Sequence, residues 1–386
     1  MSRFLDKWNT FFAKATDAST EYGEAAGLSV LSTLTLGRRV LAGGPSGIPP
    51  NLFLMLVGES SVARKSTTVT FARKMIEEVD PKRVGPRDYT PEALLKWITT
   101  PDPGTKKGRS KLCLFAEEFG SDLARSVTYA KTMKADFCSL YDGESFEKVR
   151  MTGTITVSKP RVNMFAAAAY QMLASNLKSE DWASGYMMRF IYVQPTKLRP
   201  KFLLQPAWPK QEWDCASVAA TTLREDLAKG YGALGFESAA EAYFTHWLGQ
   251  IDQFVSGLTA DAEIKGVYLG RFRVNVQKIA LLYQLDIDPM SPDIGMAATD
   301  KAIKFAVRAL WPSFEEVYAR TTRDDVKALT AAIQERVRAL GEVSRRDLTK
   351  EFGVTQLTRR VLETCVWSGS IVEVSIAGMP VLRWRS

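Results

Sequence analysis

The sequence contains one histidine and four cysteines among its 386 residues. Any Ser-His-Asp or Cys-His catalysis would therefore have to use His246, and a Cys₂His₂ zinc site is impossible. The cysteines form no CxxC pair, which argues against structural zinc and iron–sulfur clusters. Four scattered thiols also fit a reducing cytosol. Chemistry in this chain must depend on carboxylates, lysine, arginine, hydroxyl groups or a bound nucleotide and metal.

Long apolar runs are missing as well. No stretch reaches the eighteen or so residues that a membrane span needs, and the first residues lack the apolar core of a signal peptide. We therefore expect a protein of the cytoplasm, of a bacterial host if it is phage-encoded, with no membrane partner. The charge is moderate: 51 Lys and Arg against 43 Asp and Glu give a net charge of +8. This excess is compatible with a nucleic-acid partner but does not require one.

Continuous apolar runs bounded by turn residues predict strands that are buried on both faces. They occur at 52–57, 112–116 and 190–193, and the segment 162–169, which is apolar except for Asn163, also predicts a buried strand. Helical periodicity lies between them at 66–79 and 91–99, and strands that alternate with helices favour a parallel-sheet α/β core. Residues 146–159 alternate polar and apolar side chains, which predicts a hairpin with Gly153 at its turn.

We expect four parts along the chain: a helical N-terminal segment at 1–48, the α/β core at 49–200, a helical lid at 201–321 and a winged helix-turn-helix at 322–386. Residues 199–213 are rich in Pro and Trp and indicate a linker, and the pattern from 216 to 320 is helical. The last part is predicted to contain helices at 324–340, 344–352 and 355–367, followed by two strands within 370–385.

The sharpest motif is GESSVARKST at 58–67, between a buried strand and a helix. Phosphate binding needs inward backbone N–H groups, a helix N-terminus, a lysine for the phosphate oxygens and a hydroxyl for Mg²⁺. Lys65 and Ser66 supply the last two, with Thr67 as an alternative metal ligand. Compared with GxxxxGK[ST], the loop is one residue longer and Arg64 replaces the second glycine; the alternative is a serine-capped helix after an ordinary strand. We expect ATP with Mg²⁺ to contact Gly58, Ser60, Ala63, Arg64, Lys65, Ser66 and Thr67.

The strand at 112–116 runs directly into Glu117 and Glu118. A carboxylate at such a position holds Mg²⁺ through water, and a second one orients the attacking water. We assign the metal to Glu117, together with Ser66, and the water to Glu118. The alternative is a pair of solvated acids at a strand end.

The chain here begins to resemble the replication ATPases of phages and mobile elements. The likeness rests on the phosphate loop, the strand that ends in carboxylates, LYDG at 140–143 and GYMMRF at 185–190. It covers roughly residues 20–320 and implies a RecA/AAA+ type core, with a loop that tolerates the Arg-Lys-Ser/Thr spacing.

A more distant likeness is to the minichromosome maintenance helicases. Arg189 resembles their arginine finger, which reaches the nucleotide of the neighbouring subunit, and Arg271 in RFRVNVQKIA resembles their sensor 2. Both would stabilise the charge that develops on the transferring phosphoryl group. Arg189 could instead pair with Asp181 or another nearby acid, and Arg271 could be a solvated helix cation. The family's sensor 1 Asn would fall at Ala169, so Gln171, Tyr170 or Asn163 would have to position water.

Two regions carry basic residues that suit a phosphate backbone. The hairpin stands where those helicases have a DNA-contacting hairpin, and a C-terminal winged helix also occurs among them. The winged-helix segment 341–386 has a weak net charge, and such domains also mediate protein contacts. The candidate DNA contacts are Lys148, Arg150, Lys159, Arg345, Arg346, Arg359 and Arg360.

The sequence thus predicts an AAA+-type P-loop ATPase that translocates on or unwinds DNA, single-stranded or forked, during replication of a phage or mobile element. An arginine finger that acts on the nucleotide of a neighbouring subunit implies a homo-oligomer, and we expect a hexameric ring. The principal alternative is an ATP-controlled DNA-binding initiator, loader or regulator with slow or no hydrolysis. A scaffold with a vestigial nucleotide site would bind no nucleotide.

Overall fold

The computed structural model describes residues 3–44, 46–59, 63–101, 108–119, 130–150, 153–177, 179–197, 199–202, 204, 206–230, 232–256, 262–352, 356–367, 370–376 and 379–384. The chain divides into two compact units. The larger unit comprises Met1–Asn176 and Asp181–Val317, and the smaller comprises Leu177–Glu180 and Tyr318–Ser386. The larger unit therefore contains most of the three segments that precede residue 322.

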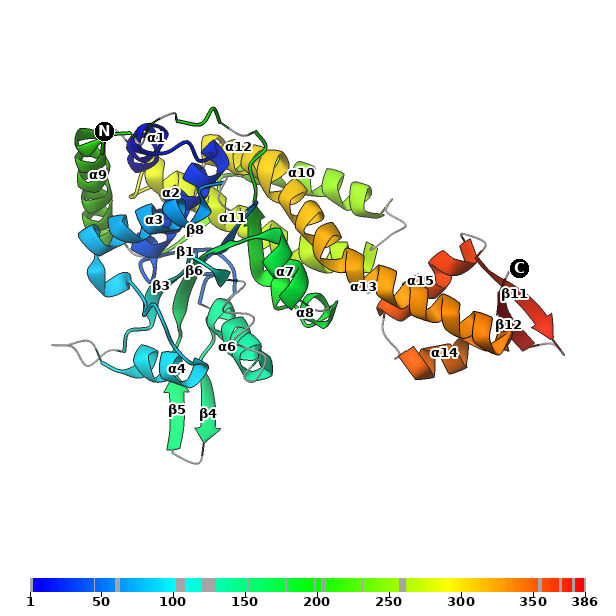
Figure 1. The fold of residues 1–386 in the computed structure, drawn as a ribbon. Helices are drawn as coiled ribbons and strands as arrows, with labels where there is room; N and C mark the ends of the chain where they lie inside the picture. Colours follow the sequence, from blue (N-terminus) through cyan, green and yellow to red (C-terminus); the bar gives the residue numbers. More distant parts are fainter. Residues whose placement is uncertain are drawn as a thin grey trace. The chain divides into compact units, whose positions relative to one another are not determined.

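A four-stranded parallel sheet forms the centre of the larger unit (Figure 1). Its strands are β2 (Phe53–Val57), β3 (Lys111–Ala116), β6 (Arg161–Ala168) and β7 (Phe190–Val193). Their order is β3-β6-β2-β7, so β6 separates β2 from β3. The strands expected from the four apolar runs are confirmed, and the fold is mixed α/β.

Helices cover both faces of this sheet. On one face, Cys113 and Asn163, which are partners in the β3–β6 register, contact α2 (Thr20–Thr35) through its serine side chains. On the other face, the ring of Phe53 lies 5.1 Å from the ring of Tyr141 in α6 (Ala130–Asp142). Because both faces are buried, nearly every strand side chain is apolar, which explains the lack of alternation. The exception inside β6, Asn163, is hydrogen-bonded.

A second parallel sheet joins distant parts of the chain. It contains β1 (Arg39–Leu41), β8 (Gly232–Phe236) and β9 (Asp293–Ile294) in the order β1-β8-β9. The expectation of an entirely helical stretch from 216 to 320 is therefore wrong at β8 and β9, and the segment expected to be helical at 1–48 contains the strand β1. Gly232 and Gly235 weaken the strand signal of β8, which depends on pairing with residues about 190 positions away.

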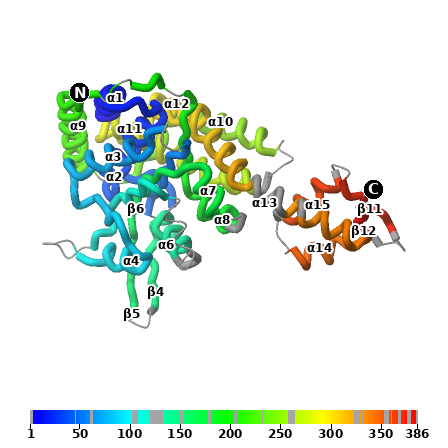
Figure 2. Tube along the Cα trace, in the orientation of Figure 1, coloured from blue at the N-terminus to red at the C-terminus, as the bar shows by residue number. Residues whose placement is uncertain are grey.

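The segment that we expected to be a linker, 199–213, ends in a helix. Here α9 (Lys210–Lys229) begins at Lys210 and packs along α1 (Phe4–Ala15), as the two views of the chain show (Figures 1 and 2). The ring of Phe11 lies 5.3 Å from the ring of Trp208 and 5.0 Å from that of Trp213. The tryptophans that suggested a linker are thus part of a packed aromatic cluster.

The hairpin predicted at 146–159 is confirmed. Its strands β4 (Phe146–Arg150) and β5 (Gly153–Val157) pair antiparallel and extend away from the sheet beside α4 (Pro91–Thr99) (Figure 1). The helix expected at 66–79 is α3 (Lys65–Val79). The remaining helices of this region are η1 (Pro81–Arg83), α7 (Tyr170–Asn176), α8 (Ser179–Ala183), η2 (Met187–Arg189), α10 (Ser238–Ser256), α11 (Ala262–Ile287), α12 (Met296–Phe305) and the π-helical turn η3 (Ala306–Leu310).

The smaller unit combines helices with a three-stranded antiparallel sheet. Its elements are the end of α13 (Trp311–Leu340), β10 (Glu342–Val343), α14 (Arg345–Phe352), α15 (Gln356–Trp367), β11 (Ile371–Ile376) and β12 (Met379–Trp384), with sheet order β10-β12-β11. The two later helices and both strands are confirmed. The first helix was placed too late, because α13 begins at Trp311 rather than at Asp324. Apolar side chains from every one of these helices and strands form its core.

Candidate functional site

The loop that follows β2 approaches neighbouring groups so closely that its first residue has to be glycine. A Cβ on Gly58 would lie 2.7 Å from the hydroxyl oxygen of Tyr22 and 3.2 Å from the Cβ of Ala63. Tyr22 is fixed there because its hydroxyl donates to the carbonyl of Val57 at 2.7 Å. The turn out of the central strand is therefore held from the α2 side.

Lys65 is the first residue of α3 and is 9% exposed. Its ammonium group donates to the carbonyl oxygens of Gly58 and Glu59, each at 2.8 Å. Burial lowers the pKa of this lysine, and the nearby Glu59 carboxylate partly opposes that effect. The ammonium group of Lys65 is therefore bound to two carbonyl oxygens at the start of the loop. Phosphate oxygens could take the place of these carbonyls as hydrogen-bond acceptors.

The backbone of Arg64 is left-handed, with φ 55° and ψ 31°. This is the position where the sequence departs from GxxxxGK[ST], and glycine adopts the same conformation without a steric penalty. The arginine side chain turns outward to Asp17, with 3.0 Å between Nε and Oδ1. Ala63 is buried, whereas Ser60 lies outside the described residues.

The hydroxyl residue and the carboxylate assigned to Mg²⁺ lie at the start of α3 and the end of β3, two elements that contact each other. Ser66 is exposed in the first turn of α3, and Thr70 follows it by four residues on the same helix face. The hydroxyl oxygen of Thr70 lies 3.4 Å from Oε1 of Glu117, which directly follows β3. Glu117 and Glu118 are both exposed, and Thr67 is half-buried.

Ser66 and Glu117 offer too few oxygen ligands for a metal site made by protein alone. They fit the smaller number of protein ligands that Mg²⁺ has when it is bound together with a nucleotide. Among the described residues, no three His, Cys, Asp or Glu side chains group closely enough to hold a metal ion. Mg²⁺ commonly uses one or two protein oxygens and completes its shell with phosphates and water. One hydroxyl at Ser66 and one carboxylate at Glu117 match that requirement.

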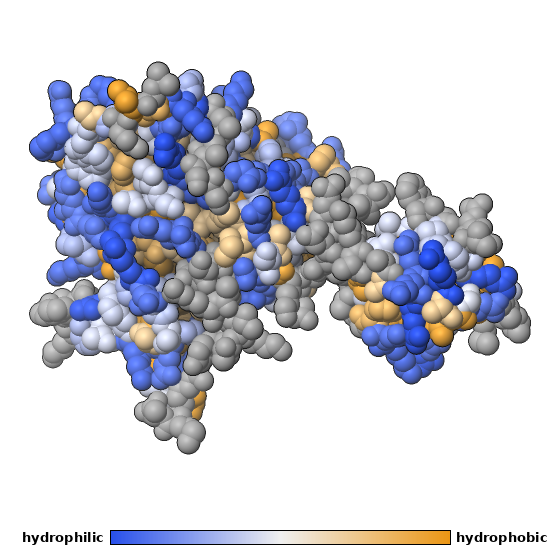
Figure 3. Space-filling view, in the orientation of Figure 1, coloured by the Kyte–Doolittle hydropathy of each residue, from blue (hydrophilic) through white to orange (hydrophobic). Residues whose placement is uncertain are grey.

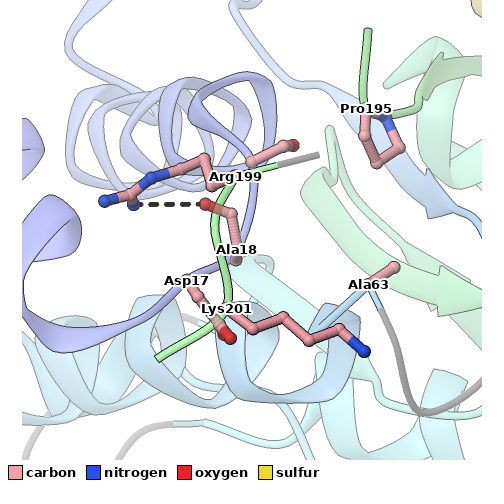
Figure 4. Close-up of a pocket in the computed structure, with 7 residues that line it drawn as sticks. Asp17, Ala18, Ala63, Pro195, Arg199 and Lys201 are labelled. Carbon is pink, nitrogen blue, oxygen red and sulfur yellow. Dashed lines mark hydrogen bonds between the residues drawn. The ribbon is translucent and has the colours of Figure 1, made fainter. Parts of the chain in front are cut away.

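A small cavity adjoins the loop on the side of the α1–α2 connection (Figure 4). Its lining includes Asp17, Ser19, Ala63, Pro195 and Lys201. Its volume of about 20 Å³ suits roughly one water molecule, so the cavity is too small for a nucleoside.

Arg189 is buried within its own chain. It is 9% exposed, and its guanidinium forms a two-pronged pair with Asp142, at 3.1 Å from Nε to Oδ1 and 2.6 Å from Nη2 to Oδ2. Its Nη1 donates to the carbonyl of Gly185 at 2.9 Å. Of the two sequence interpretations, this geometry is that of an arginine paired with a nearby acid. The acid is Asp142 of the LYDG motif, since Asp181 pairs with Lys134.

Arg271 lies next to this pair. A Cβ on Gly185 would be 3.3 Å from Nη1 of Arg189 and also 3.3 Å from Nη2 of Arg271. Arg271 is half-buried and lines a cleft of about 230 Å³ with Asn51, Tyr141 and Asp142 among its other walls. The structure thus brings the two predicted arginines together, and it adds the LYDG motif to them.

The two arginines and the loop that follows β2 lie at opposite ends of the strands of the central sheet. Arg189 directly precedes β7, and its neighbour Phe190 pairs with Phe53 at the start of β2, whereas the loop follows Val57 at the end of β2. A strand of this length spans about 15 Å. Both arginines therefore lie at the opposite ends of the strands from Lys65.

Lys278 is a buried cation that the sequence analysis did not identify. It is 3% exposed at the floor of the cleft, and its Nζ donates to the carbonyl of Asn51 at 3.0 Å and to its Oδ1 at 3.1 Å. The ammonium also lies 4.5 Å from the ring centroid of Tyr141. Burial lowers the pKa of Lys278 to about 7, despite the opposing Asp142 carboxylate.

Of the three residues considered for sensor 1, Asn163 is committed elsewhere. It is fully buried, its Oδ1 accepts from Ser32 at 3.0 Å and from the Leu52 N–H at 2.8 Å, and its Nδ2 donates to Thr33 at 2.8 Å. Tyr170 and Gln171 follow β6 at the same edge as the loop. Tyr170 donates to Gln194, and Gln171 is exposed.

The candidate DNA contacts include side chains in ion pairs with acids of the same chain and side chains that are exposed. Lys148 pairs with Asp136, and Arg345 pairs with Glu373 at 3.0 Å. Exposed side chains among the candidates are those of Lys159, Arg346 and Arg359. The side chains of Arg150 and Arg360 lie outside the described part. The visible face of the smaller unit is mostly hydrophilic (Figure 3).

No protein-family model matches this chain, and neither does any curated protein. Within the described part of the chain, no helix combines the length and the apolar character that crossing a membrane requires.

Proposed function

We propose that this protein is a Mg²⁺-dependent ATPase of the P-loop, AAA+ type. The observation that carries the proposal is the position of Lys65 and Ser66 at the N-terminus of a 15-residue helix, which a loop at 58–64 connects to the central buried strand. Helix N-termini attract phosphate because their N–H groups are unpaired and the helix dipole is positive there. The lysine supplies a cation at the same point.

The strand order supports the same proposal. Because β6 lies between β2 and β3, the carboxylates that follow β3 are displaced from the loop by two strand spacings, or about 10 Å. That separation leaves room for phosphate groups and water between Lys65 and Glu117. When bound, Mg²⁺ would neutralise phosphate charge, with Ser66 and Glu117 as its protein contacts. Glu118 would orient the attacking water.

We extend the proposal to a homo-oligomer that acts on DNA in the replication of a phage or mobile element. Arg189 and Arg271 lie at the opposite ends of the strands from the loop, so we propose that they contact the nucleotide of a neighbouring copy. A head-to-tail contact of this kind closes into a ring when its rotation permits, and we propose a hexamer. The hairpin and a winged-helix domain formed by the smaller unit would contact single-stranded or forked DNA.

The proposed location is the cytoplasm of a bacterial host. All four cysteines are free thiols, which supports a reducing compartment.

One observation favours a second candidate function, an ATP-controlled DNA-binding initiator, loader or regulator with slow or no hydrolysis. Arg189 is held by Asp142 of its own chain, and this pair would have to open before the arginine could contact another subunit's nucleotide. A protein that remains in this arrangement would bind ATP and turn it over slowly.

The two candidates differ in steady-state ATP hydrolysis with and without single-stranded DNA. The motor predicts turnover that DNA stimulates, that Lys65→Ala abolishes, and that Arg271→Ala strongly reduces. Mixing these two variants would restore part of the activity, because some interfaces then combine an intact Lys65 with an intact Arg271. Binding of ATP without turnover, in the presence or absence of DNA, would reject the motor and support the regulator.

A further inference from the structure

Arg64 has a backbone conformation that disfavours every residue except glycine and, to a lesser degree, asparagine and aspartate. It is also the N-cap of α3: its carbonyl accepts from the N–H of Thr68 at 3.1 Å and from the Thr68 hydroxyl at 3.0 Å. The φ of 55° at this residue sets the direction in which Lys65 enters the helix. Some interaction has to hold an arginine in this conformation.

Asp17 provides that interaction. Its side chain is 7% exposed, and each carboxylate oxygen has a donor: Oδ1 accepts from Nε of Arg64 at 3.0 Å and Oδ2 accepts from the N–H of Phe202 at 3.3 Å. The carboxylate therefore joins the phosphate loop to the segment that follows β7. A charged acceptor makes a stronger hydrogen bond than a neutral one, and here the donor, the Arg64 side chain, is 39% exposed.

Asp17 is itself fixed on both sides. Arg199 donates to the carbonyls of Thr16 at 2.9 Å and Ala18 at 3.3 Å, and Figure 4 shows the latter bond beside the Asp17 side chain. Ser19, two residues further on, caps α2 by accepting from the N–H of Tyr22. The carboxylate is thus held by a rigid connection between α1 and α2.

We propose that Asp17 is a positioning residue for the phosphate loop: its ion pair with Arg64 replaces the conformational freedom that glycine supplies at this position of the usual motif. The inference rests on the proposed nucleotide-binding function. It predicts that Asp17 is needed only while residue 64 is arginine, because glycine adopts the left-handed conformation without help.

A double-mutant cycle tests this dependence. We would titrate wild type, Asp17→Asn, Arg64→Gly and the double variant with a fluorescent ATP analogue and Mg²⁺, and record the thermal midpoint of each without nucleotide. Asparagine offers one oxygen to the two donors that Asp17 serves, so it breaks one of the two bonds. Asp214→Asn, which removes an exposed carboxylate that pairs with Lys210, is the matched control.

Asp17→Asn is expected to weaken nucleotide binding at least tenfold and to lower the thermal midpoint. In the Arg64→Gly background, adding Asp17→Asn should change neither the affinity for nucleotide nor the thermal midpoint any further. Normal binding by Asp17→Asn, or an equal loss from this substitution in wild type and in the Arg64→Gly variant, would overturn the positioning role alone. Failure of all folded variants, wild type included, to bind nucleotide would overturn the proposed function and this role with it.

Discussion

The buried Lys278 makes the stability of the larger unit depend on pH in a specific way. Burial lowers its pKa from 10.5 to about 7, so between these values the unfolded chain carries a proton on this amine that the folded chain lacks. Stability rises with pH wherever the unfolded state binds more protons. The penalty for burying this amine is therefore complete below pH 7 and is relieved as the pH rises toward 10.5.

The size of the effect follows from the same two pKa values. The slope approaches 1.4 kcal/mol per pH unit well above pH 7 and is about half of that at pH 7. From pH 7 to pH 9, the free energy of unfolding should therefore gain about 2 kcal/mol from Lys278. Methionine at this position removes the titration while it keeps a chain of similar length over the Tyr141 ring.

Urea unfolding of wild type and Lys278→Met at pH 7, 8 and 9, followed by tryptophan fluorescence, measures this gain. Wild type should become more stable relative to the variant by about 2 kcal/mol across that range, since other titrating groups cancel in the comparison. Lys301→Met is the control, because Lys301 also lies over an aromatic ring, 4.3 Å from the centroid of Tyr283, but is only half-buried. Equal pH dependence in wild type and Lys278→Met would refute the reasoning.

Three further substitutions test other contacts by urea unfolding. Gly58→Ala should lower the free energy of unfolding by about 2 kcal/mol, because the new Cβ meets the Tyr22 hydroxyl, and Tyr22→Phe should restore part of the loss. An unchanged free energy of unfolding in Gly58→Ala would contradict the close approach. Asn163→Ala should cost about 3 kcal/mol, since it leaves the buried N–H of Leu52 without an acceptor, and a loss below 1 kcal/mol would count against that bond. Arg189→Ala should lower the free energy of unfolding by about 2 kcal/mol, less than the loss for a fully buried ion pair, because the Asp142 side chain is 44% exposed. If the losses from Arg189→Ala and Asp142→Ala simply add in the double variant, the two side chains are not coupled.

The sequence predicted the central sheet well because each of its strands consists almost entirely of apolar residues. A strand buried on both faces has no other pattern, and short turns on either side marked its ends. The alternation of polar and apolar side chains at 146–159 predicted the hairpin equally well. In contrast, β8 contains two glycines and β9 has only two residues, and these strands depend on pairing with β1 and with each other, which no local pattern reveals.

For the candidate site, the sequence located the residues of the loop but not the groups that hold them. Asp17 lies 47 positions from Arg64, and Asp142 lies 47 positions from Arg189. Carboxylates are common on the surface, so nothing in the sequence distinguished Asp17 from a solvated one, and the LYDG motif drew attention to Asp142 without indicating its partner. Lys278 gave a weak signal, since it precedes the apolar stretch at 279–283 in a long helix.

Calorimetric titration of the protein with ATP and Mg²⁺ tests the central claim, that the loop between β2 and α3 binds nucleotide, most directly. Lys65→Ala removes the buried lysine, and Lys96→Ala, which removes an exposed lysine paired with Glu92, is the matched control. We predict saturable binding by wild type and by Lys96→Ala, and a loss of at least a hundredfold in affinity for Lys65→Ala. Absence of binding by wild type, or equal affinity in a folded Lys65→Ala variant, would contradict the account.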